Sequence, residues 1–415
     1  MRCHTASVPA ADHERLPVTL ADVRAAAEML AEIARVTPVV GSRVLTARCG
    51  GEVRFKCENL QRGGSFKLRG AYVRIARLSE EQRRAGVVAA SAGNHAQGVA
   101  LAASLLGCSA TVVMPLGAPL PKIAATEGYG ATVRLIGADV EEALVAAAAL
   151  AEETGAVFIH PFDHVDVVAG QGTVGLEILD QVPDVRTIVV PTGGGGLLAG
   201  IAAAVAHRPE VRVVGVQAAG AAAYPESIAA GHPVALDGVS TMADGIAIGR
   251  PGAVPFAVVS ALVPDVRTVS EESLSRALLL CLERAKLVVE PAGAAGVAAI
   301  LDDPQAFEPP VVAVLSGGNV DPLLMHRLLR HGLAASGRFV AFRTRMTDRP
   351  GALAALLHEL AEADANVLEV EHLRTNPRLH VDEAEVYVQI ETRGGKHTDA
   401  VLARLRSAGY PLIFG

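Results

Sequence analysis

The feature that most limits the fold of this chain is an alternation of short, mainly apolar runs with longer stretches rich in alanine and leucine. The apolar runs lie at 87–90, 110–114, 132–136, 187–190, 211–216 and 311–315. The helical stretches lie at 18–36, 95–106, 139–154, 196–207, 271–286 and 321–332. Buried strands that alternate with helices predict an α/β fold, in which parallel sheets are covered by helices. Ligands bind such sheets at the carboxyl ends of the strands, where the connecting loops gather.

The pattern changes near 332–337, where a run of small residues interrupts the chain. The remainder predicts a strand, a helix, two strands, a helix and a strand, at 338–345, 352–362, 365–374, 381–390, 398–407 and 411–414. This βαββαβ order is that of ferredoxin-like domains. The segment is poor in clusters of catalytic residue types, so we expect it to serve binding or assembly.

Composition and charge exclude several classes of protein. With a net charge of -7, no basic run and 3% aromatic residues, the chain lacks the features that nucleic acid binding requires. No signal peptide is expected, because the first 17 residues carry charges and hold no apolar core. The uncharged stretch 187–206 holds Pro191 and four consecutive glycines, which favours a strand, a loop and a helix over a membrane span. Five cysteines without a CxxC pair fit a reducing cytoplasm and predict no zinc site.

Lys67 stands at the start of a predicted helix, after a strand-like run at 53–57 and the turn Gly63-Gly64-Ser65. A helix N-terminus favours negative charge, so a cation is poorly placed there. The position suits a lysine that acts as a neutral amine or is masked as an imine. An ordinary solvated lysine would also account for it.

A glycine run, Gly193 to Gly196, follows a predicted strand and opens a helix with Leu197. Glycines there let backbone N–H groups approach an anion, and the helix dipole favours its charge. A tight turn explains one or two glycines but not four, so the run predicts a phosphate-binding loop. The pattern Gly-x-Gly-x-x-Ala at 194–199 also satisfies a loose dinucleotide fingerprint. Gln217 stands where a ribose-binding acid would be expected, which makes NAD the weaker choice.

Two more polar loops follow predicted strands in the same way. The first, Ser91-Ala92-Gly93-Asn94-His95, offers short polar side chains and free N–H groups that suit a carboxylate, although helix capping would explain Ser91 or Asn94 alone. The second, Ser316-Gly-Gly-Asn319, allows the same two interpretations. An amine, a phosphate loop, a carboxylate turn and a hydroxyl together fit one cofactor, pyridoxal phosphate, whose aldehyde forms an imine with lysine.

Five motifs carry a resemblance to a known family: Ser65 to Ala71, Ser91 to His95, Gly193 to Leu197, Glu290 to Ala294 and Ser316 to Asn319. In this order they closely resemble the serine/threonine dehydratases, among them the threonine ammonia-lyases, of the tryptophan synthase β-like fold (fold type II of the pyridoxal phosphate enzymes). The resemblance covers about residues 18–332. The segment 338–415, with Asp348-Arg349-Pro350-Gly351 after its first strand, resembles an ACT domain.

The resemblance implies a domain organisation. An N-terminal extension at 1–17 precedes a two-lobed catalytic domain at 18–335, whose smaller lobe is expected at roughly 68–168. An ACT regulatory domain follows at 336–415. A homo-oligomer, either a dimer or a tetramer, is expected.

The resemblance also implies a role for each motif. Lys67 would hold the cofactor as an imine and would remove the Cα proton of the substrate. Ser316 would meet the ring nitrogen, where a neutral hydroxyl makes the ring a weaker electron sink than a carboxylate would. The other cofactor contacts implied are Phe66, Asn94, Gly193, Gly194, Gly195, Gly196, Leu197, Gly245 and Glu290. The implied substrate contacts are Ser91, Ala92, Gly93, Asn94 and His95, and the implied effector contacts, for isoleucine or valine, are Asp348, Arg349, Pro350 and Gly351.

The activity implied is deamination of L-threonine to 2-oxobutanoate and ammonia by α,β-elimination of water, in isoleucine biosynthesis or threonine catabolism. Two departures refine this expectation. Serine racemases of this fold have a second hydroxyl base where this chain has Ala92, so elimination is favoured over racemisation. Relatives that bind a divalent cation have acidic residues where this chain has Gln217, Ala221 and Ala223, so no metal site is expected.

Several alternatives stay open at this point. A dehydratase that prefers serine and forms pyruvate differs by one methyl group of substrate, which a pocket discriminates by only about 1–3 kcal/mol. A non-catalytic amino acid sensor would have lost the lysine or the glycine run, and both are intact. An NAD-dependent oxidoreductase would bind nicotinamide rather than absorb light as an imine. The ACT-like segment would serve assembly alone if it has no ligand.

Overall fold

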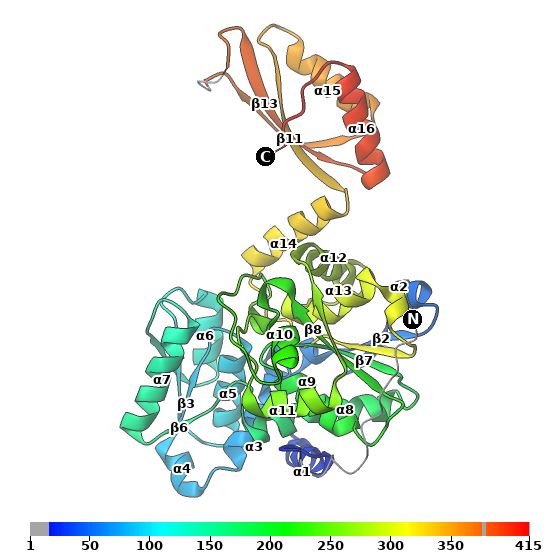
Figure 1. The fold of residues 1–415 in the computed structure, drawn as a ribbon. Helices are drawn as coiled ribbons and strands as arrows, with labels where there is room; N and C mark the ends of the chain where they lie inside the picture. The colour runs from blue at the N-terminus through cyan, green and yellow to red at the C-terminus, as the bar shows by residue number, and fades with distance from the viewer. Residues whose placement is uncertain (1–15, 376–378, 415) are drawn as a thin grey trace. The chain divides into compact units, whose positions relative to one another are not determined.

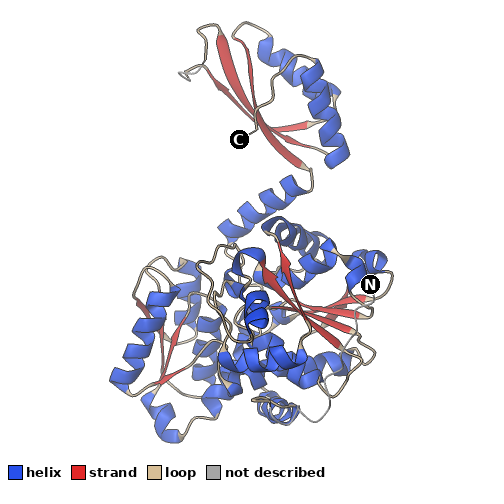
Figure 2. Ribbon diagram, in the orientation of Figure 1, coloured by secondary structure: helices blue, strands red, loops and turns tan. Residues whose placement is uncertain are grey.

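The computed structural model describes residues 16–375 and 379–414. The expected N-terminal extension lies outside the described residues except for Leu16 and Pro17. Contacts within the chain separate two compact units, Met1–Pro322 and Leu323–Gly415. The first unit contains two sheets covered by helices, and the second contains one small sheet (Figures 1 and 2).

The larger sheet of the first unit has six strands in the order β1-β2-β10-β7-β8-β9. Every neighbouring pair is parallel except β1 and β2 at one edge. The strands are β1 (Val39–Gly41), β2 (Val53–Lys56), β7 (Thr187–Pro191), β8 (Arg212–Ala218), β9 (Asp265–Val269) and β10 (Val311–Val314). The helices of this lobe are α1 (Leu20–Leu30), α2 (Arg43–Cys49), α8 (Val165–Gln181), α9 (Gly196–Val205), α10 (Ala223–Ala230), α11 (Ala253–Leu262), α12 (Glu271–Leu280) and α13 (Ala295–Asp302).

The smaller sheet has four parallel strands in the order β5-β4-β3-β6. Its strands are β3 (Val87–Ala90), β4 (Ala110–Met114), β5 (Thr132–Leu135) and β6 (Val157–Phe158). Its helices are α4 (Glu80–Ala85), α5 (Asn94–Leu105), α6 (Leu120–Gly128) and α7 (Val140–Thr154). This is the α/β architecture of parallel sheets that the alternating pattern predicts.

Helix α3 (Lys67–Ala76) connects the two lobes through its packing. Val73 belongs to the core of the larger lobe, whereas Leu68 and Ile75 belong to the core of the smaller one. Since side chains three or four positions apart share one face of a helix, α3 buries different faces in different cores. Lys67, its first residue, is thereby held in place from both lobes.

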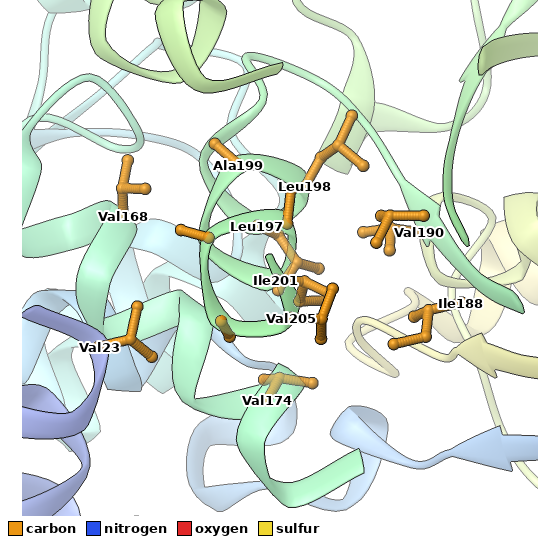
Figure 3. Packing of buried hydrophobic residues seen from close by; sticks show 14 of the residues in the cluster. Val23, Val168, Val174, Ile188, Val190, Leu197, Leu198, Ala199, Ile201 and Val205 are labelled. Atoms are coloured by element: carbon orange, nitrogen blue, oxygen red, sulfur yellow. The ribbon is translucent and has the colours of Figure 1, made fainter. Parts of the chain in front are cut away.

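The core of the larger lobe is centred on α9, every residue of which is buried. Figure 3 shows Leu197, Ile201 and Val205 among side chains of neighbouring elements, including Val168 of α8 and Val190 of β7. A helix that is apolar all round is typical of such a central position. The uncharged stretch 187–206 is therefore a strand, a loop and a helix, as expected. Within the described residues, no helix is both long and apolar enough to cross a membrane.

The second unit begins with most of α14 (Pro322–Ala335) and continues with β11 (Phe339–Thr347), α15 (Ala352–Glu362), β12 (Asn366–Leu373), β13 (Glu383–Glu391) and α16 (Gly395–Ser407). Its antiparallel sheet has the order β11-β13-β12. Side chains of α15 and α16, such as Leu356 and Leu405, share a core with this sheet. The last strand expected, 411–414, is reduced to one bridge between Ile413 and Arg343. The unit is consistent with an ACT-like domain.

The first helix is shorter than the sequence pattern suggests. It begins after Thr19, which forms a capping box with Asp22, but it ends at Leu30 rather than near Val36. The side chain of Gln61 bonds both the N–H and the carbonyl of Arg35, at 2.9 and 2.8 Å. These bonds take the backbone N–H and carbonyl of Arg35 out of the helix, which a local sequence pattern does not reveal.

Candidate active site

Lys67 is the first residue of α3, where the sequence predicts it, and no acidic residue stands in the first turn. Its Nζ donates a hydrogen bond to the carbonyl of Pro161 at 2.9 Å and lies 5.3 Å from the centre of the Phe66 ring. Burial lowers the pKa of Lys67 to about 8, although the nearby carboxyl of Glu290 opposes this shift. A substantial fraction of the amine is therefore neutral near pH 8, as a nucleophile or a base must be.

The glycine loop connects β7 to α9. Gly195 is the N-cap of α9 with φ at 97°, a backbone conformation that favours glycine. At the two neighbouring positions, packing requires glycine instead. A Cβ on Gly194 would lie 2.4 Å from the Phe162 ring, and a Cβ on Gly196 would lie 3.1 Å from Phe162. Turn geometry and packing thus explain more of the run than the sequence argument allowed.

The backbone of this loop nevertheless keeps the property that anion binding needs. Among the described residues, the N–H groups of Gly193 to Leu198 have no acceptor. Several free N–H groups at the N-terminus of a buried helix form a site for a phosphate. Phe162, which packs on the loop, adjoins Pro161, whose carbonyl accepts from Lys67. The loop and the lysine therefore belong to one site.

Asn94 and Glu290 meet near Lys67, whose pKa the Glu290 carboxyl raises against the effect of burial. Asn94 is the first residue of α5, and its Nδ2 donates to Oε1 of Glu290 at 2.6 Å. Its Oδ1 accepts from Nδ2 of Asn319 at 2.8 Å. Burial raises the pKa of Glu290 to about 7, so this carboxyl can exchange a proton near neutral pH. A Cβ on Gly245 would lie 3.5 Å from Oε1 of the same carboxyl, which brings the loop at Gly245 to the site as well.

Ser316 follows β10 and is buried. Its carbonyl accepts from the backbone N–H of Phe66 at 3.2 Å, and Ser65 and Gly317 form a β-bridge beside it. The Ser316 loop therefore lies against the backbone that leads into Lys67. Within the part of the chain that the structure describes, the Ser316 hydroxyl has no hydrogen-bond partner, so it is available to a ligand.

The turn from Ser91 to His95 connects β3 to α5. The Ser91 hydroxyl accepts from the N–H of Gly93 at 3.1 Å, so it stabilises the turn itself. His95 is buried, its Nε2 lies 2.8 Å from the carbonyl of Ile159, and burial lowers its pKa to about 3. The neutral ring therefore donates to that carbonyl within the smaller lobe. In the described chain, the N–H groups of Asn94 and His95 have no acceptor, and they offer the anion contact that the sequence predicts.

The predicted effector residues belong to the second unit. Asp348 precedes Gly351, which is the N-cap of α15 with φ at 88°, and Oδ2 of Asp348 accepts from Nε of Arg374 at 2.7 Å. Arg349 and Pro350 complete the turn between β11 and α15. These residues lie together in one loop, but their assignment to an effector stays a prediction.

The structure also adds residues that the sequence did not single out. Pro161 and Phe162 connect Lys67 to the glycine loop. Lys122 and Asp244 form an ion pair at 3.6 Å, and both charges act on Glu290. No sequence motif predicts these residues, because tertiary contacts, and not a local pattern, bring each of them to the site. Gln217, which argued against NAD, is fully buried and its Oε1 accepts from the N–H of Tyr224 at 2.9 Å.

These residues fit pyridoxal phosphate. The free N–H groups at 193–198 would hold its phosphate, the Lys67 amine would take its aldehyde, and the unpartnered Ser316 hydroxyl would meet its ring nitrogen. Phe66 lies beside the lysine, where its side chain would contact the ring of the cofactor. The donor set contains each chemical group that this cofactor requires.

Comparisons with known proteins show which family the chain resembles. Residues 30–317 match the family described as pyridoxal-phosphate dependent enzyme. An L-threonine ammonia-lyase of Thermotoga maritima is 46% identical over 394 residues, which are 95% of this chain and 98% of that protein. The processed form of threonine deaminase isoform 2 from Solanum lycopersicum has a TM-score of 0.73 at 36% identity and covers 78% of this chain and 94% of its own. Maize serine racemase has a TM-score of 0.72 at 38% identity and covers 77% of this chain and 98% of its own.

The fold and the site thus define a class, the fold type II enzymes that depend on pyridoxal phosphate, and the chain belongs to it. Within this class it is grouped with the threonine ammonia-lyases, because its similarity to one of them extends over nearly its whole length. Pyridoxal phosphate, expected from the motifs, is confirmed as its cofactor, and the NAD alternative is set aside.

Replacing Gly195 with alanine tests the glycine loop. The added Cβ would need an unfavourable positive φ and would lie 1.8 Å from the hydroxyl oxygen of Tyr224. We expect at least about tenfold weaker binding of pyridoxal phosphate, measured by titration of the apoprotein, since the loop must shift and its N–H groups move with it. Gly231→Ala is the matched control, because Gly231 has φ at 74° with open space around it. Equal cofactor affinity in the two variants would contradict the phosphate assignment.

Proposed function

We propose that this enzyme deaminates L-threonine to 2-oxobutanoate and ammonia by α,β-elimination of water. One observation carries the proposal. The Lys67 amine, with its pKa lowered to about 8, lies where the Ser316 loop, the Asn94 turn and, through Pro161 and Phe162, the glycine loop converge. The similarity to an L-threonine ammonia-lyase over 95% of the chain supports the choice of substrate.

Pyridoxal phosphate supplies, when bound, an electron-withdrawing ring that stabilises the negative charge left on Cα after proton removal. The residues of the chain direct this chemistry. Lys67 accepts the Cα proton, because a base with a pKa near the working pH can both take up and release a proton. The free N–H groups of Asn94 and His95 orient the substrate through its carboxylate.

The partner that Ser316 provides for the ring nitrogen is neutral. A hydroxyl cannot hold that nitrogen protonated in the way that a carboxylate does. The negative charge at Cα is therefore stabilised only briefly, which favours loss of the β-hydroxyl over slower reactions of the same carbon. Ala92 supports the same conclusion, because a methyl group at the Ser91 turn cannot serve as a second base for racemisation.

A parallel ketoacid assay tests the function. The purified holoenzyme is incubated with L-threonine and with L-serine, and 2-oxobutanoate, pyruvate, ammonia and D-amino acids are measured. We expect 2-oxobutanoate and ammonia in equal amounts, with a higher kcat/KM for threonine than for serine. A preference for serine would favour the alternative dehydratase that forms pyruvate. Accumulation of D-amino acids without ketoacid would replace the proposed function with racemisation.

The lowered pKa of Lys67 predicts how cofactor attachment depends on pH. Only the neutral amine attacks an aldehyde, so the recombination rate of apoprotein with pyridoxal phosphate should rise about tenfold per pH unit below the pKa and level off above it. For Lys67 the plateau of the rate is expected near pH 8. An ordinary lysine would reach its plateau about two pH units higher. Glu290→Gln removes a charge that raises the pKa of Lys67, so its plateau should begin at lower pH. A rate that still rises steeply at pH 10 in the unmodified protein would contradict the assignment.

We further propose that the second unit is an ACT domain that binds a branched-chain amino acid at Asp348 to Gly351. Among the described residues, the N–H groups of Gly351, Leu353 and Ala354 at the beginning of α15 have no acceptor, and they suit the carboxylate of an amino acid. The Asp348 carboxylate, which is paired with Arg374, suits its ammonium group. Isoleucine or valine should raise the thermal midpoint and shift the dependence of rate on threonine, and Asp348→Ala should remove both effects. If neither amino acid changes either quantity, the unit serves assembly only.

We also propose a cytoplasmic setting for this enzyme. Cys49, Cys57, Cys108 and Cys281 are free thiols in the structure, and burial raises the pKa of each. Such thiols fit the reducing cytoplasm. A homo-oligomer and a role in isoleucine biosynthesis or threonine catabolism belong to the same proposal, and sedimentation of the holoenzyme with and without isoleucine tests the first of these.

A further inference from the structure

A second lysine lies close to the site. Lys122 belongs to α6 of the smaller lobe, and its side chain is only 16% exposed. Its Nζ lies 3.6 Å from Oδ2 of Asp244, which belongs to the larger lobe and is 67% exposed. Because one partner is largely solvated and the separation is long for an ion pair, the attraction between them is weak. A stronger anion could therefore take the place of Asp244.

The ammonium group of Lys122 faces the Ser91 turn. A Cβ built on Gly93 would lie 4.0 Å from Nζ of Lys122. The N–H groups of Asn94 and His95, at the beginning of the twelve-residue helix α5, have no acceptor among the described residues. A positive side chain and two free N–H groups thus border the same small space. Together they form a site for one carboxylate.

The other charged groups near this space are accounted for. Glu290 bonds Asn94, and its ionisation is favoured by the charges of Lys122 and Lys67 and opposed by that of Asp244. Lys67 donates to Pro161 and is assigned to the cofactor. Of the cations named here, Lys122 alone combines a place beside the turn with a weakly held partner. An α-amino acid substrate brings one α-carboxylate, which these groups match.

We propose that Lys122 binds the substrate carboxylate, and that Asp244 holds its ammonium group in place until the substrate replaces it. The proposal rests on the proposed function for the identity of the substrate as an α-amino acid. It adds a full positive charge to the turn that the sequence identified. It also gives Asp244 a function, since exchange of its carboxylate for that of the substrate releases an ion pair between the two lobes.

Variants of Lys122 and Asp244 test the proposal. Lys122→Met keeps the length of the side chain but removes the charge, and Lys122→Arg keeps the charge. For Lys122→Met we expect a KM for threonine at least tenfold higher, a smaller change in kcat and an unchanged cofactor absorbance. Lys122→Arg should recover part of the loss. Asp244→Asn should lower KM, because it removes the anion that competes with the substrate.

A readout of carboxylate recognition separates this role from a structural one. The ratio of kcat/KM for threonine to that for its methyl ester should fall at least tenfold in Lys122→Met, which general loosening of α6 would not cause. Spectral titration with L-2-aminobutanoate, which has no leaving group, should show at least tenfold weaker binding in the same variant. An unchanged ratio and unchanged binding would overturn the proposal, as would weaker binding in Asp244→Asn.

The outcome is distinct from that of the proposed function. If the unmodified enzyme forms no ketoacid but binds 2-aminobutanoate in a manner that depends on Lys122, then the assignment of Lys122 stands and the proposed reaction fails. If ketoacid forms and Lys122→Met behaves as the unmodified enzyme does, the reaction stands and the assignment fails.

Discussion

Replacing Lys67 with alanine is expected to remove the absorbance of the bound cofactor and to lower turnover by at least about a thousandfold, since both the attachment point and the base are lost. The methyl group of alanine can neither bond an aldehyde nor accept the Cα proton. The fold should persist, because the Lys67 amine makes one bond, to the carbonyl of Pro161, and α3 keeps its apolar contacts with both lobes.

Lys396→Ala provides the matched control for this change. Lys396 is an exposed lysine of α16 in the second unit, so its loss removes the same charge from the chain and leaves every residue of the site unchanged. Spectrum and kcat/KM are expected to stay within about twofold of the unmodified enzyme, as is usual for surface substitutions. If Lys67→Ala retains either the absorbance or the turnover, Lys67 does not hold the cofactor.

Replacing Arg69 with methionine is expected to lower the free energy of unfolding of the first unit by about 3–5 kcal/mol, the usual effect of breaking a buried ion pair from one side. Arg69 lies two residues after Lys67 and is 1% exposed. Its Nε and Nη2 donate to the carboxylate of Glu58 at 2.9 Å each, and its Nη1 donates to Glu177 at 2.6 Å. Loss of Arg69 leaves the fully buried Glu58 without its cation.

Two controls make this prediction specific. Arg62→Met removes an exposed arginine and should cost less than about 0.5 kcal/mol. The double variant Glu58→Gln/Arg69→Met should recover part of the loss, because it no longer buries an unpaired charge. Urea unfolding monitored on the apoprotein gives the three values. If Arg69→Met alone is no less stable than Arg62→Met, the ion pairs of Arg69 with Glu58 and Glu177 do not stabilise the start of α3.

The sequence predicted the parts of the fold that local patterns encode. The strands at 87–90, 110–114 and 311–315 are found within one residue of their expected ends, because short, mainly apolar runs leave few alternatives. Helix α8 was missed, although it has seventeen residues. Its glycines at 170, 172 and 175 disguise it, and the structure explains them, since a Cβ on Gly172 would lie 2.6 Å from the carbonyl of Gly200 in α9. The close packing of α8 against α9 requires these glycines, and a local sequence pattern does not reveal that packing.

Some residues of the candidate site could likewise be predicted from local patterns, and others could not. Lys67, the glycine loop and Ser316 stand directly after strands or at helix starts, so their positions follow from the order of elements. Lys122, Asp244 and Phe162 reach the site only because two lobes fold toward one another, and no local spacing relates them. The glycine run shows that a local pattern can also have more than one cause. Its four glycines predicted a phosphate loop, yet Phe162 and Tyr224 explain several of them by packing alone.

The central claim is that the amine of Lys67 holds the cofactor. Borohydride reduction of the purified holoenzyme makes that attachment permanent, and mass analysis of the peptides then locates it. We expect one phosphopyridoxyl group, on the peptide that contains Lys67, and none after reduction of Lys67→Ala. A group on Lys122, the other lysine beside the site, or no group on any peptide would contradict it.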